Sequence, residues 1–335
     1  MVTGGAGYIG SHAVLELLDA GYSLVVIDDL SNGHRELIPK GCEFIQCNAG
    51  DSASVNKILR SFRVKSVMHF AGSAIVEESV IKPLKYYENN TEVTRKLIDC
   101  CIKQNVHQFI FSSTAAVYGN PQKTLLTEDD TIAPVNPYGA SKAITERMLT
   151  EVAATSQLRF IALRYFNVAG ADHGNRIGQL TENSTHLIKA ACETALGKRP
   201  YITIFGNNYD TRDGTCIRDY IHVSDLASVH VKALEYLELN TESRILNCGY
   251  GKGYSVREVL EIVQELTGEA LSIRQGSRRA GDAAEVVADT ARLRNLLNWN
   301  PAYNNLRKIV SDTLEWEALL TNKKACTYES VDHIN

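Results

Sequence analysis

The sequence of 335 residues predicts an α/β fold in which a doubly wound parallel sheet is joined to a smaller lobe of mixed α/β structure. Three observations support this prediction. A glycine-rich turn lies at the start of the chain, apolar strands alternate with helical segments up to residue 164, and the later elements are shorter and mixed. Regular alternation of strands and helices is typical of a parallel sheet that is covered by helices on both faces.

Strands and helices alternate most clearly in the first half of the chain. Apolar residues at helical spacing predict a helix over 11–20, and a short apolar run predicts a strand over 24–27. Further strands are expected over 43–45, 66–69, 108–111 and 160–163, with helices over 52–62, 86–104 and 138–154. The first strand is nearly absent, because only about two residues precede the glycines, whereas strands usually have about five. Either the sheet contains a very short strand or the start lies upstream.

The second half of the chain has a different character. Residues 165–184 are rich in Gly, Asn and polar residues, which is typical of a binding loop. Helices are expected over 187–196, 256–266, 290–297 and 306–320 and after residue 223 as far as 236, with strands over 203–205 and up to residue 247. We therefore expect a nucleotide-binding domain over 1–164, a substrate lobe over 165–320 from which some segments return to the first domain, and a polar, frayed tail over 321–335.

Composition excludes several kinds of partner. The net charge of -4 gives no support for binding to nucleic acid or to an anionic membrane surface. No apolar run has the length of a membrane span, and no signal peptide opens the chain. The eight cysteines do not have the spacing of a zinc site. We therefore expect a cytoplasmic protein that uses no metal.

The glycine turn predicts a dinucleotide-binding site. Gly4, Gly7 and Gly10 precede the first helix, so the backbone can approach a pyrophosphate and the helix N-terminus can face the anion. Asp28 ends the next strand, 18 residues after Gly10, where an acid can bind a ribose hydroxyl. This arrangement of strand, turn, helix, strand and acid indicates a Rossmann-like domain. A carboxylate at this position would repel a 2′-phosphate, which favours NAD over NADP.

A Tyr–Lys pair supplies the candidate chemistry. Tyr138 and Lys142 are four residues apart on a helix that begins near Pro137, so both side chains lie on one face. The ammonium group would stabilise the phenolate and lower the pKa of Tyr138, which would let the phenol exchange protons near neutral pH. Polar residues at the carboxyl ends of the strands, including Asn48 and Thr114, would meet a ligand there.

Longer motifs point to a known family. The Gly4–Gly10 turn, Thr114 and the Tyr138-x-x-x-Lys142 pair resemble the extended short-chain dehydrogenase/reductase family. Within it, five further segments resemble the UDP-glucose 4-epimerase family, and the match extends from residue 2 to about 317. These segments are His69–Gly72, Ser112–Gly119, Arg164–Ala171, Asp213–Val223 and Arg278–Asp282.

The resemblance implies an NAD-dependent isomerase that inverts C4 of a UDP-hexose through a transient 4-keto sugar. Tyr138 would take the proton from the 4-hydroxyl, Thr114 would bind the reacting oxygen, and Lys142 would hold the nicotinamide ribose. The resemblance also implies a homodimer that pairs through the helices over 86–104 and 138–154. The implied NAD-binding residues are Gly4, Gly7, Tyr8, Ile9, Gly10, Asp28, Asp29, Asn48, Ala49, Phe70, Ala71, Gly72, Asn90, Ser112, Tyr138, Lys142 and Tyr165.

The substrate residues carry over in the same way. Asn167, Arg218 and Arg279 correspond to diphosphate contacts, and the planar guanidinium groups suit phosphate oxygens. A single arginine could equally form a surface ion pair. The other implied contacts are Phe205 and Tyr220 at the uridine, Asp282 at a ribose or uridine, and Thr114, His186, Leu187, Val256 and Val286. We interpret His69, His222 and Cys216 as structural residues instead.

Several positions depart from the family pattern. Asn48 replaces an Asp near the adenine, and Ala74 replaces a Lys near the pyrophosphate, so retention of NAD is expected to be weaker. Val286 corresponds to the position that faces the C2 substituent of the hexose, where a small residue would admit an acetamido group. UDP-N-acetylglucosamine 4-epimerase activity, or a dual specificity, is therefore an alternative. Ala115 and Ala116 disfavour a dehydratase, which needs an acid and a base there, and the intact Tyr–Lys pair disfavours a non-catalytic NAD-binding regulator.

Overall fold

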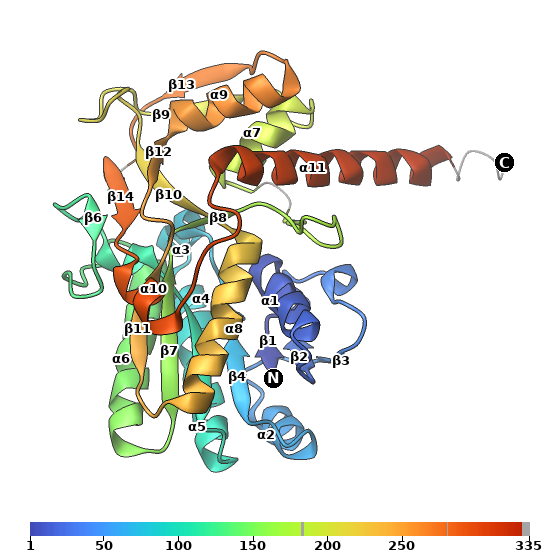
Figure 1. Cartoon of the computed structure of the whole chain (residues 1–335), viewed down its shortest axis with the longest axis vertical. Coiled ribbons are helices and arrows are strands. Elements are labelled where there is room, and N and C mark those ends of the chain that lie inside the picture. The colour runs from blue at the N-terminus through green and yellow to red at the C-terminus, as the bar shows by residue number, and fades with distance from the viewer. Residues whose placement is uncertain (182–183, 280, 330–335) are drawn as a thin grey trace.

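The structure, a computed structural model, describes residues 1–181, 184–279 and 281–329, with side chains through residue 322. A seven-stranded parallel sheet forms the centre of the larger lobe, and helices cover both of its faces (Figure 1). This confirms the predicted fold class. In spatial order its strands are β11 (Arg244–Cys248), β7 (Arg159–Tyr165), β5 (Gln108–Thr114), β4 (Ser66–His69), β1 (Val2–Thr3), β2 (Val25–Asp28) and β3 (Glu43–Gln46).

Side chains that alternate along the strands build two hydrophobic cores. Val26 and Ile110 belong to one core, whereas their neighbours Ile27 and Phe111 belong to the other, because successive residues of a strand point to opposite faces. Helices α1 (Tyr8–Asp19), α8 (Val223–Leu239) and α10 (Ala291–Leu297) contribute to the first core, and α2 (Ser52–Ser61), α5 (Val93–Lys103) and α6 (Pro137–Thr155) contribute to the second. The larger lobe is thus a three-layer sandwich.

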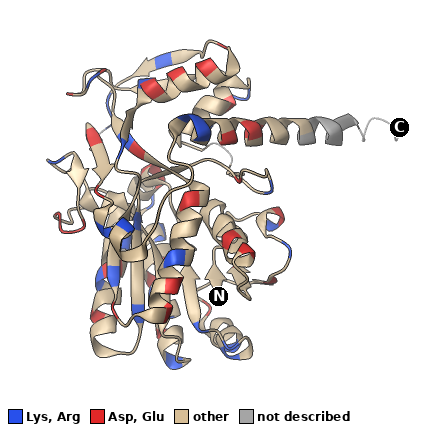
Figure 2. Cartoon of the chain, viewed as in Figure 1, with Lys and Arg blue, Asp and Glu red and all other residues tan. Residues whose placement is uncertain are grey.

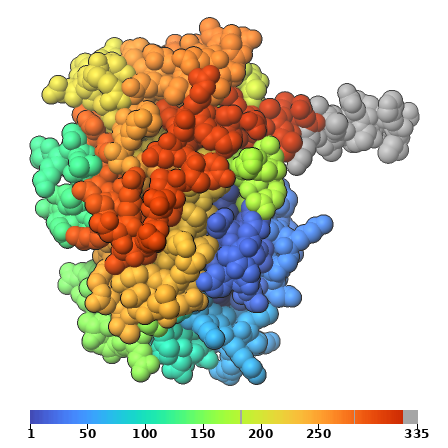
Figure 3. All heavy atoms as spheres, viewed as in Figure 1, coloured from blue at the N-terminus to red at the C-terminus, as the bar shows by residue number. Residues whose placement is uncertain are grey.

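The smaller lobe is organised around β10 (Ile217–His222), which pairs with β8 (Asn167–Ala169), β12 (Gly253–Ser255) and β14 (Glu285–Ala288). β14 also pairs with β6 (Leu125–Leu126), and β9 (Ile202–Phe205) pairs with β13 (Ile273–Gly276). Helices α7 (Leu187–Ala195), α9 (Val256–Thr267) and α11 (Leu306–Glu329) pack here. Late segments form much of the face seen in Figure 3, where α8 and α10 belong to the larger lobe.

The very short first strand lies at the centre of the sheet. Val2 and Thr3 pair with β2 on one side and with β4 on the other, and both residues are fully buried. The carbonyl of Met1 accepts a hydrogen bond from the Met68 amide at 2.9 Å. Flanking backbone contacts therefore compensate for the missing length, and the sheet accommodates a strand of two residues.

The prediction of one continuous α-helix over 86–104 was wrong, because the segment is divided. The helical segment begins at α4 (Pro83–Tyr86), passes through a π-helical stretch over Tyr87–Glu92 and continues as α5. The wider turn brings the buried Asn90 inward, where its amide bonds the backbone of Ser73 at 2.8 and 3.0 Å and the Ser141 hydroxyl at 3.0 Å. A short helix, α3 (Val76–Ile81), precedes it and was not predicted.

Other differences concern short strands and the end of the chain. β6, β8, β10, β12, β13 and β14 were not predicted, and β8 lies inside the segment expected to be a loop. The frayed tail predicted from residue 321 is instead helical as far as Glu329, and the rest of that tail lies outside the described residues. No helix of the described chain is long and apolar enough to cross a membrane. Basic and acidic residues are interspersed over both lobes (Figure 2).

We expect the stability of the fold to fall in mild acid because three buried histidines stay neutral in the folded state. Burial lowers the pKa of His12 and His230 to about 4 and that of His69 to about 3. The unfolded chain takes up these protons below about pH 6.5, so the free energy of unfolding decreases as the pH falls through that value. Each histidine contributes about 1.4 kcal/mol of this loss at pH 5.5, or roughly 4 kcal/mol together.

Asp219 opposes this effect, because burial raises its pKa to about 6 and the folded state binds a proton first. It offsets about 1 kcal/mol between pH 7.5 and 5.5. The three histidines and Asp219 should therefore account together for a net loss of about 3 kcal/mol in urea unfolding between these two pH values, a large part of the usual stability of a domain. Replacement of the exposed His173 by Gln is the control and should leave the difference unchanged. Equal free energies of unfolding at the two pH values would contradict the prediction.

Candidate active site

The glycine turn forms a closed cradle at the carboxyl end of β1. The order of the strands reverses between β1 and β4, which is where ligands bind in doubly wound sheets. Gly4 has a φ of +71°, and a Cβ added there would lie 2.4 Å from the Ala71 amide nitrogen. A Cβ on Gly10 would lie 2.1 Å from the Gly4 carbonyl oxygen. Both positions therefore require glycine, and the turn lies against the loop after β4.

The acid at the end of β2 braces the same turn. Asp28 is buried, and its carboxylate accepts hydrogen bonds from the backbone N–H groups of Ala6 at 3.0 Å and Leu30 at 2.9 Å. Burial raises the pKa of Asp28, and these two hydrogen bonds partly oppose the rise. Each carboxylate oxygen keeps a further lone pair with which it can bind a ribose hydroxyl. The first turn of α1 begins after Gly7, which has no side chain to cap it, and its N–H groups can receive an anion.

The remaining predicted cofactor residues line the same edge of the sheet. Asn48 donates a hydrogen bond to the Asp29 carboxylate at 2.7 Å and accepts one from the Gly50 amide at 2.8 Å. The Tyr8 hydroxyl donates to the Gly170 carbonyl at 2.7 Å, which ties the turn to the loop after β8. Of the others, Ala49, Phe70, Ala71 and Gly72 follow strands, and Ser112 and Tyr165 lie near the ends of β5 and β7. Ile9 lies in α1, and Asn90 lies in the π-helical stretch. The cradle, the acid and the free first turn together fit a dinucleotide such as NAD.

The structure brings the three predicted catalytic side chains to the ends of β5 and α6. Thr114 is the last residue of β5 and lies beside the hydroxyl of Tyr138, which is the second residue of α6. Asn136 caps this helix and accepts a hydrogen bond from the Gly139 amide at 2.8 Å. Lys142 is buried one turn later and donates to the Ser112 carbonyl at 2.8 Å.

The predicted pKa shift of Tyr138 was wrong in direction. Burial raises the pKa of the Tyr138 phenol, and the hydrogen bond with Thr114 only partly opposes this. Burial also lowers the pKa of Lys142 to about 8, and the nearby Glu146 carboxylate partly opposes that shift. Removal from water thus outweighs the Tyr–Lys attraction, because desolvation penalises both charged forms.

A buried polar network behind these residues was not predicted. Glu146 lies one turn after Lys142 and forms a buried ion pair with Arg164 at 2.7 Å. The Ser113 hydroxyl donates to the same carboxylate at 2.5 Å, and Arg164 donates to the Tyr118 hydroxyl at 2.8 Å. The spacing of four residues between Lys142 and Glu146 was the available signal, since such residues share a helix face. The network fixes α6 against β5 and β7.

The two predicted diphosphate arginines are both paired with carboxylates. Arg218, in β10, forms an ion pair with Asp282 and donates to the Ala283 carbonyl at 2.8 Å. Arg279 lies over the ring of Phe205 at 4.1 Å and forms an ion pair at 3.3 Å with Glu77, in α3. Glu77 was not singled out from the sequence. Its contact with Arg279 joins the larger lobe to the smaller one.

Val286 is the member of its strand that faces the centre of the molecule. It is paired in register with Arg218 and packs against a cluster that contains Val117 and Phe166. The next residue, Val287, points the other way, since a Cβ on Gly253 would lie 2.8 Å from its side chain. Through these contacts Val286 lies near the residues that follow β5.

The other predicted residues are spread along the smaller lobe. Asn167 is exposed at the start of β8 and is in register with the buried Tyr220 of β10. His186 and Leu187 lie at the start of α7, and Val256 begins α9 and packs against the large core. The residues interpreted as structural are His69, which bonds Thr3 at 2.6 Å and Thr94 at 2.7 Å, His222, which pairs with Asp312 at 3.1 Å, and the buried Cys216.

Comparison with known proteins identifies the family of the chain. A model of the NAD dependent epimerase/dehydratase family matches residues 1–249. UDP-glucose 4-epimerase of Azospirillum brasilense is 51% identical over 320 residues, which cover 96% of this chain and 92% of the relative. The crystal structure of UDP-glucose 4-epimerase from Brucella ovis in complex with NAD has a TM-score of 0.91 at 40% identity and covers 94% of this chain and 96% of its own.

A third relative has a broader name. The structure of the UDP-Glc/GlcNAc 4-epimerase from Campylobacter jejuni has a TM-score of 0.84 at 42% identity, with 95% of this chain and 98% of that chain covered. The chain belongs to the UDP-glucose 4-epimerase family. This confirms the predicted family, the enzyme class and the dependence on NAD. The roles of the individual site residues remain predictions.

Proposed function

We propose that the protein interconverts UDP-glucose and UDP-galactose by inverting C4 of the hexose with bound NAD. The observation that carries this proposal is the convergence of Thr114, Tyr138 and Lys142 at the end of β5, beside the glycine cradle. One hydroxyl can hold the reacting oxygen, the phenol can exchange its proton, and the ammonium can bind a ribose hydroxyl. The names of the relatives support UDP-hexoses as substrates.

The residues of this chain suggest how inversion takes place. Tyr138 receives the proton of the 4-hydroxyl and later returns it, while Thr114 keeps the oxygen in place. When bound, NAD supplies a hydride acceptor and donor at C4 and, in its oxidised form, a positive charge that favours the phenolate. Arg218 and Arg279 hold the diphosphate, so the 4-keto sugar can turn its other face without leaving. Ala115 and Ala116 supply no acid or base for dehydration.

The test is an assay of the purified protein with NAD and UDP-galactose in the presence of a metal chelator. Formation of UDP-glucose at an undiminished rate is the expected result. Within the described residues, no cluster of His, Cys, Asp or Glu could hold a metal ion. Loss of activity on metal removal, or no turnover with NAD present, would contradict the proposal.

A second substrate pair is favoured by Val286. Its small side chain, with neither ring nor phenol, faces the cluster of Val117 and Phe166 near Thr114. We infer that the pocket also accepts UDP-N-acetylglucosamine and UDP-N-acetylgalactosamine, because Val leaves room for the acetyl group at C2. The name of the Campylobacter jejuni relative, which covers both hexose types, supports this inference.

The change Val286→Tyr should abolish turnover of the acetylated pair, because the larger ring fills the space for the acetyl group. Turnover of UDP-galactose should fall by less than about threefold, because we expect the activation free energy to rise by only a few tenths of a kcal/mol. Val287→Tyr is not a suitable control because Val287 is buried, so Val286→Leu, which keeps an aliphatic side chain, serves instead. Equal turnover of the acetylated pair by wild type and Val286→Tyr would exclude Val286 as the gate.

We also propose a homodimer that pairs through α4, α5 and α6. Large apolar side chains are exposed on or beside these helices, with Ile81 78%, Leu84 80% and Ile144 44% exposed. Large exposed apolar side chains on neighbouring helices are typical of an interface. Light scattering at micromolar concentration should give about twice the mass of 37.0 kDa. A monomer mass across that range would contradict the proposal, whereas Leu84→Glu should favour the monomer.

Three further proposals concern the division into domains, the location in the cell and the retention of NAD. We propose that the chain divides near residue 164 into the NAD-binding domain and the substrate lobe, with β11 and α8 returning to the first domain, as their places in the sheet and first core support. We propose a cytoplasmic location, which cell fractionation would test.

Ala74 is exposed beside Ser73 and brings no cation to the cofactor edge, so bound NAD should exchange readily on dilution.

A further inference from the structure

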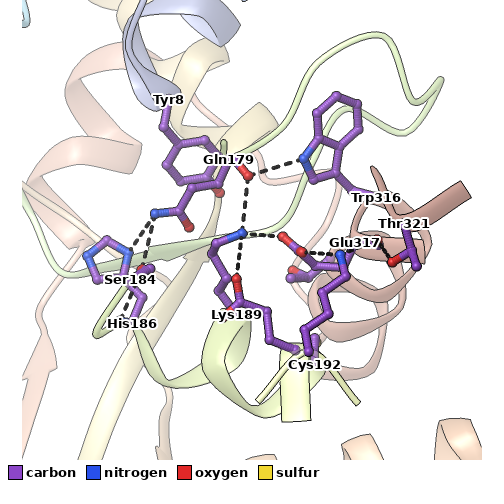
Figure 4. A network of polar contacts seen from close by, with 12 residues as sticks. Tyr8, Gln179, Ser184, His186, Lys189, Cys192, Trp316, Glu317 and Thr321 are labelled. Carbon is purple, nitrogen blue, oxygen red and sulfur yellow. Dashed lines mark hydrogen bonds and ion pairs between the residues drawn. The ribbon is translucent and has the colours of Figure 1, made fainter. Parts of the chain in front are cut away.

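A cluster of buried charges joins α7 to α11 behind the smaller lobe. Lys189 in α7 and Glu317 in α11 are only 4% and 2% exposed, and they form an ion pair. Lys189 also pairs with Glu193 at 3.1 Å, and Glu317 pairs with Lys198 at 2.8 Å. Figure 4 shows Lys189 directed at the Glu317 carboxylate and at the backbone of the segment before α7.

The ammonium of Lys189 has a third acceptor, the backbone carbonyl of Gln179, at 3.3 Å. An ammonium group has three donors. Those of Lys189 bond the Glu317 carboxylate and this carbonyl, and Glu193 adds a second negative charge 3.1 Å away. The indole N–H of Trp316 donates to the same carbonyl at 3.2 Å. Two donors from two different helices therefore fix the backbone at Gln179 (Figure 4).

The Gln179 side chain transmits this restraint to the start of α7. Its amide donates to the Ser184 hydroxyl and to a ring nitrogen of His186, each at 3.4 Å. The His186 amide donates to the same hydroxyl at 3.3 Å, and Arg199 donates to the Ser184 carbonyl at 2.8 Å. Ser184 and His186 are thus held from two sides (Figure 4). His186 and its neighbour Leu187 are among the residues expected to contact the substrate.

The buried ion pair of Lys189 and Glu317 does more than pack α7 against α11. A buried ion pair can often be replaced by apolar residues without loss of stability, since desolvation offsets the attraction. An apolar pair could dock α7 on α11, but it could not donate a hydrogen bond to the Gln179 carbonyl. The Glu317 and Glu193 carboxylates hold the ammonium in place, and one of its donors bonds the backbone. The indole of Trp316 supplies the second donor from a ring packed against Gly178.

We propose that Lys189 and Trp316 are positioning residues of the substrate site. Through the Gln179 carbonyl they hold Ser184 and His186 in the arrangement that receives the nucleotide diphosphate. This inference rests on the proposed function for the identity of the substrate. Loss of both donors should weaken binding of UDP and of the UDP-sugar while leaving the proton and hydride steps at C4 unchanged, because Thr114 and Tyr138 belong to the other lobe.

The test uses the full chain with NAD and the variant Lys189→Met/Trp316→Phe. Methionine keeps much of the length of Lys189, Phe keeps an aromatic ring against Gly178, and both buried carboxylates keep partners, Glu317 in Lys198 and Glu193 in Arg199. The control is Arg307→Met, which removes an ion pair at 2.7 Å between α11 and Glu265 that does not touch the segment. The measurements are kcat, KM for UDP-galactose, Kd for UDP, and hydrogen exchange of the Ser184 and His186 amides.

We expect KM and the Kd for UDP to rise about 10-fold in the double variant, with kcat within about twofold of wild type and faster exchange of the two amides. The control should match the wild type in all four measurements. A folded double variant with wild-type KM and Kd would overturn the inference, and so would a lower kcat with an unchanged Kd. If the double variant does not fold, Trp316→Phe alone decides, since unchanged Kd and exchange there would overturn it.

The proposed function is judged separately on the wild type. Absence of UDP binding or of turnover by the wild-type protein would refute the proposed function. The exchange measurement would still decide whether the two donors hold the segment, because it does not depend on the substrate. Wild-type turnover combined with unaffected double-variant KM would refute only the inference about Lys189 and Trp316.

Discussion

Tyr138→Phe should lower kcat for UDP-galactose by about 10²-fold or more, the range expected for loss of a general acid–base group. In the proposed mechanism the phenol hydroxyl exchanges a proton with the substrate, and it lies beside Thr114 at the end of β5. The aromatic ring remains in the variant, so KM should change by less than about threefold. Initial rates measured with saturating NAD check this result.

Tyr86→Phe is the matched control because it makes the same change next to the site. The ring centroids of Tyr86 and Tyr138 are 6.3 Å apart, but the Tyr86 hydroxyl donates to the Ile75 carbonyl and not to Thr114. Its loss should cost roughly 1 kcal/mol of stability and leave kcat within about threefold. A near-normal rate for Tyr138→Phe, or equal losses in the two variants, would refute the assigned role.

Gly10→Ala should weaken NAD binding by about 10²-fold or more and lower the thermal midpoint. The added Cβ would lie 2.1 Å from the Gly4 carbonyl oxygen and 3.0 Å from the Gly5 Cα, and backbone atoms cannot move aside as a flexible side chain can. The turn would have to open, and α1 would move away from the position that receives the pyrophosphate. Titration with NAD and a thermal melt give the two quantities.

Gly7→Ala separates folding from binding. A Cβ on Gly7 would lie 3.3 Å from the Gly4 carbonyl oxygen, a tight contact that a small shift relieves, so the thermal midpoint should stay within a few degrees. NAD binding should still weaken, because this glycine lets the backbone approach the pyrophosphate. Undiminished NAD affinity in both variants would place the cofactor elsewhere.

Sequence patterns predicted the elements whose causes are local. The glycine turn, the acid after β2 and the Tyr–Lys spacing are set by residues close together in the chain, and the structure brings them to one edge of the sheet. Strands such as β6 and β8 have two and three residues and exist only because β14 and β10, far away in the sequence, supply their hydrogen bonds. No local pattern could reveal them.

The errors at the site have a tertiary cause. The four-residue spacing of Tyr138 and Lys142 indicates attraction between charges, but it says nothing of how much water both side chains lose. In the folded protein this loss dominates and raises the pKa of Tyr138. The π-helical stretch that turns Asn90 inward and the pairing of Glu77 with Arg279 likewise depend on packing between distant segments. The sequence lists the residues that interact, but it does not show how closely they pack in the folded protein.

The pairing of Arg218 and Arg279 with carboxylates has a consequence for the response to salt. Asp282 and Glu77 already neutralise both guanidinium groups before any ligand arrives. An incoming diphosphate therefore exchanges one anion for another at these arginines instead of meeting bare positive charge. Added salt weakens the existing pairs as well as the new ones, so the two effects partly cancel. The affinity for the nucleotide should consequently vary less with ionic strength than two unpaired arginines would dictate.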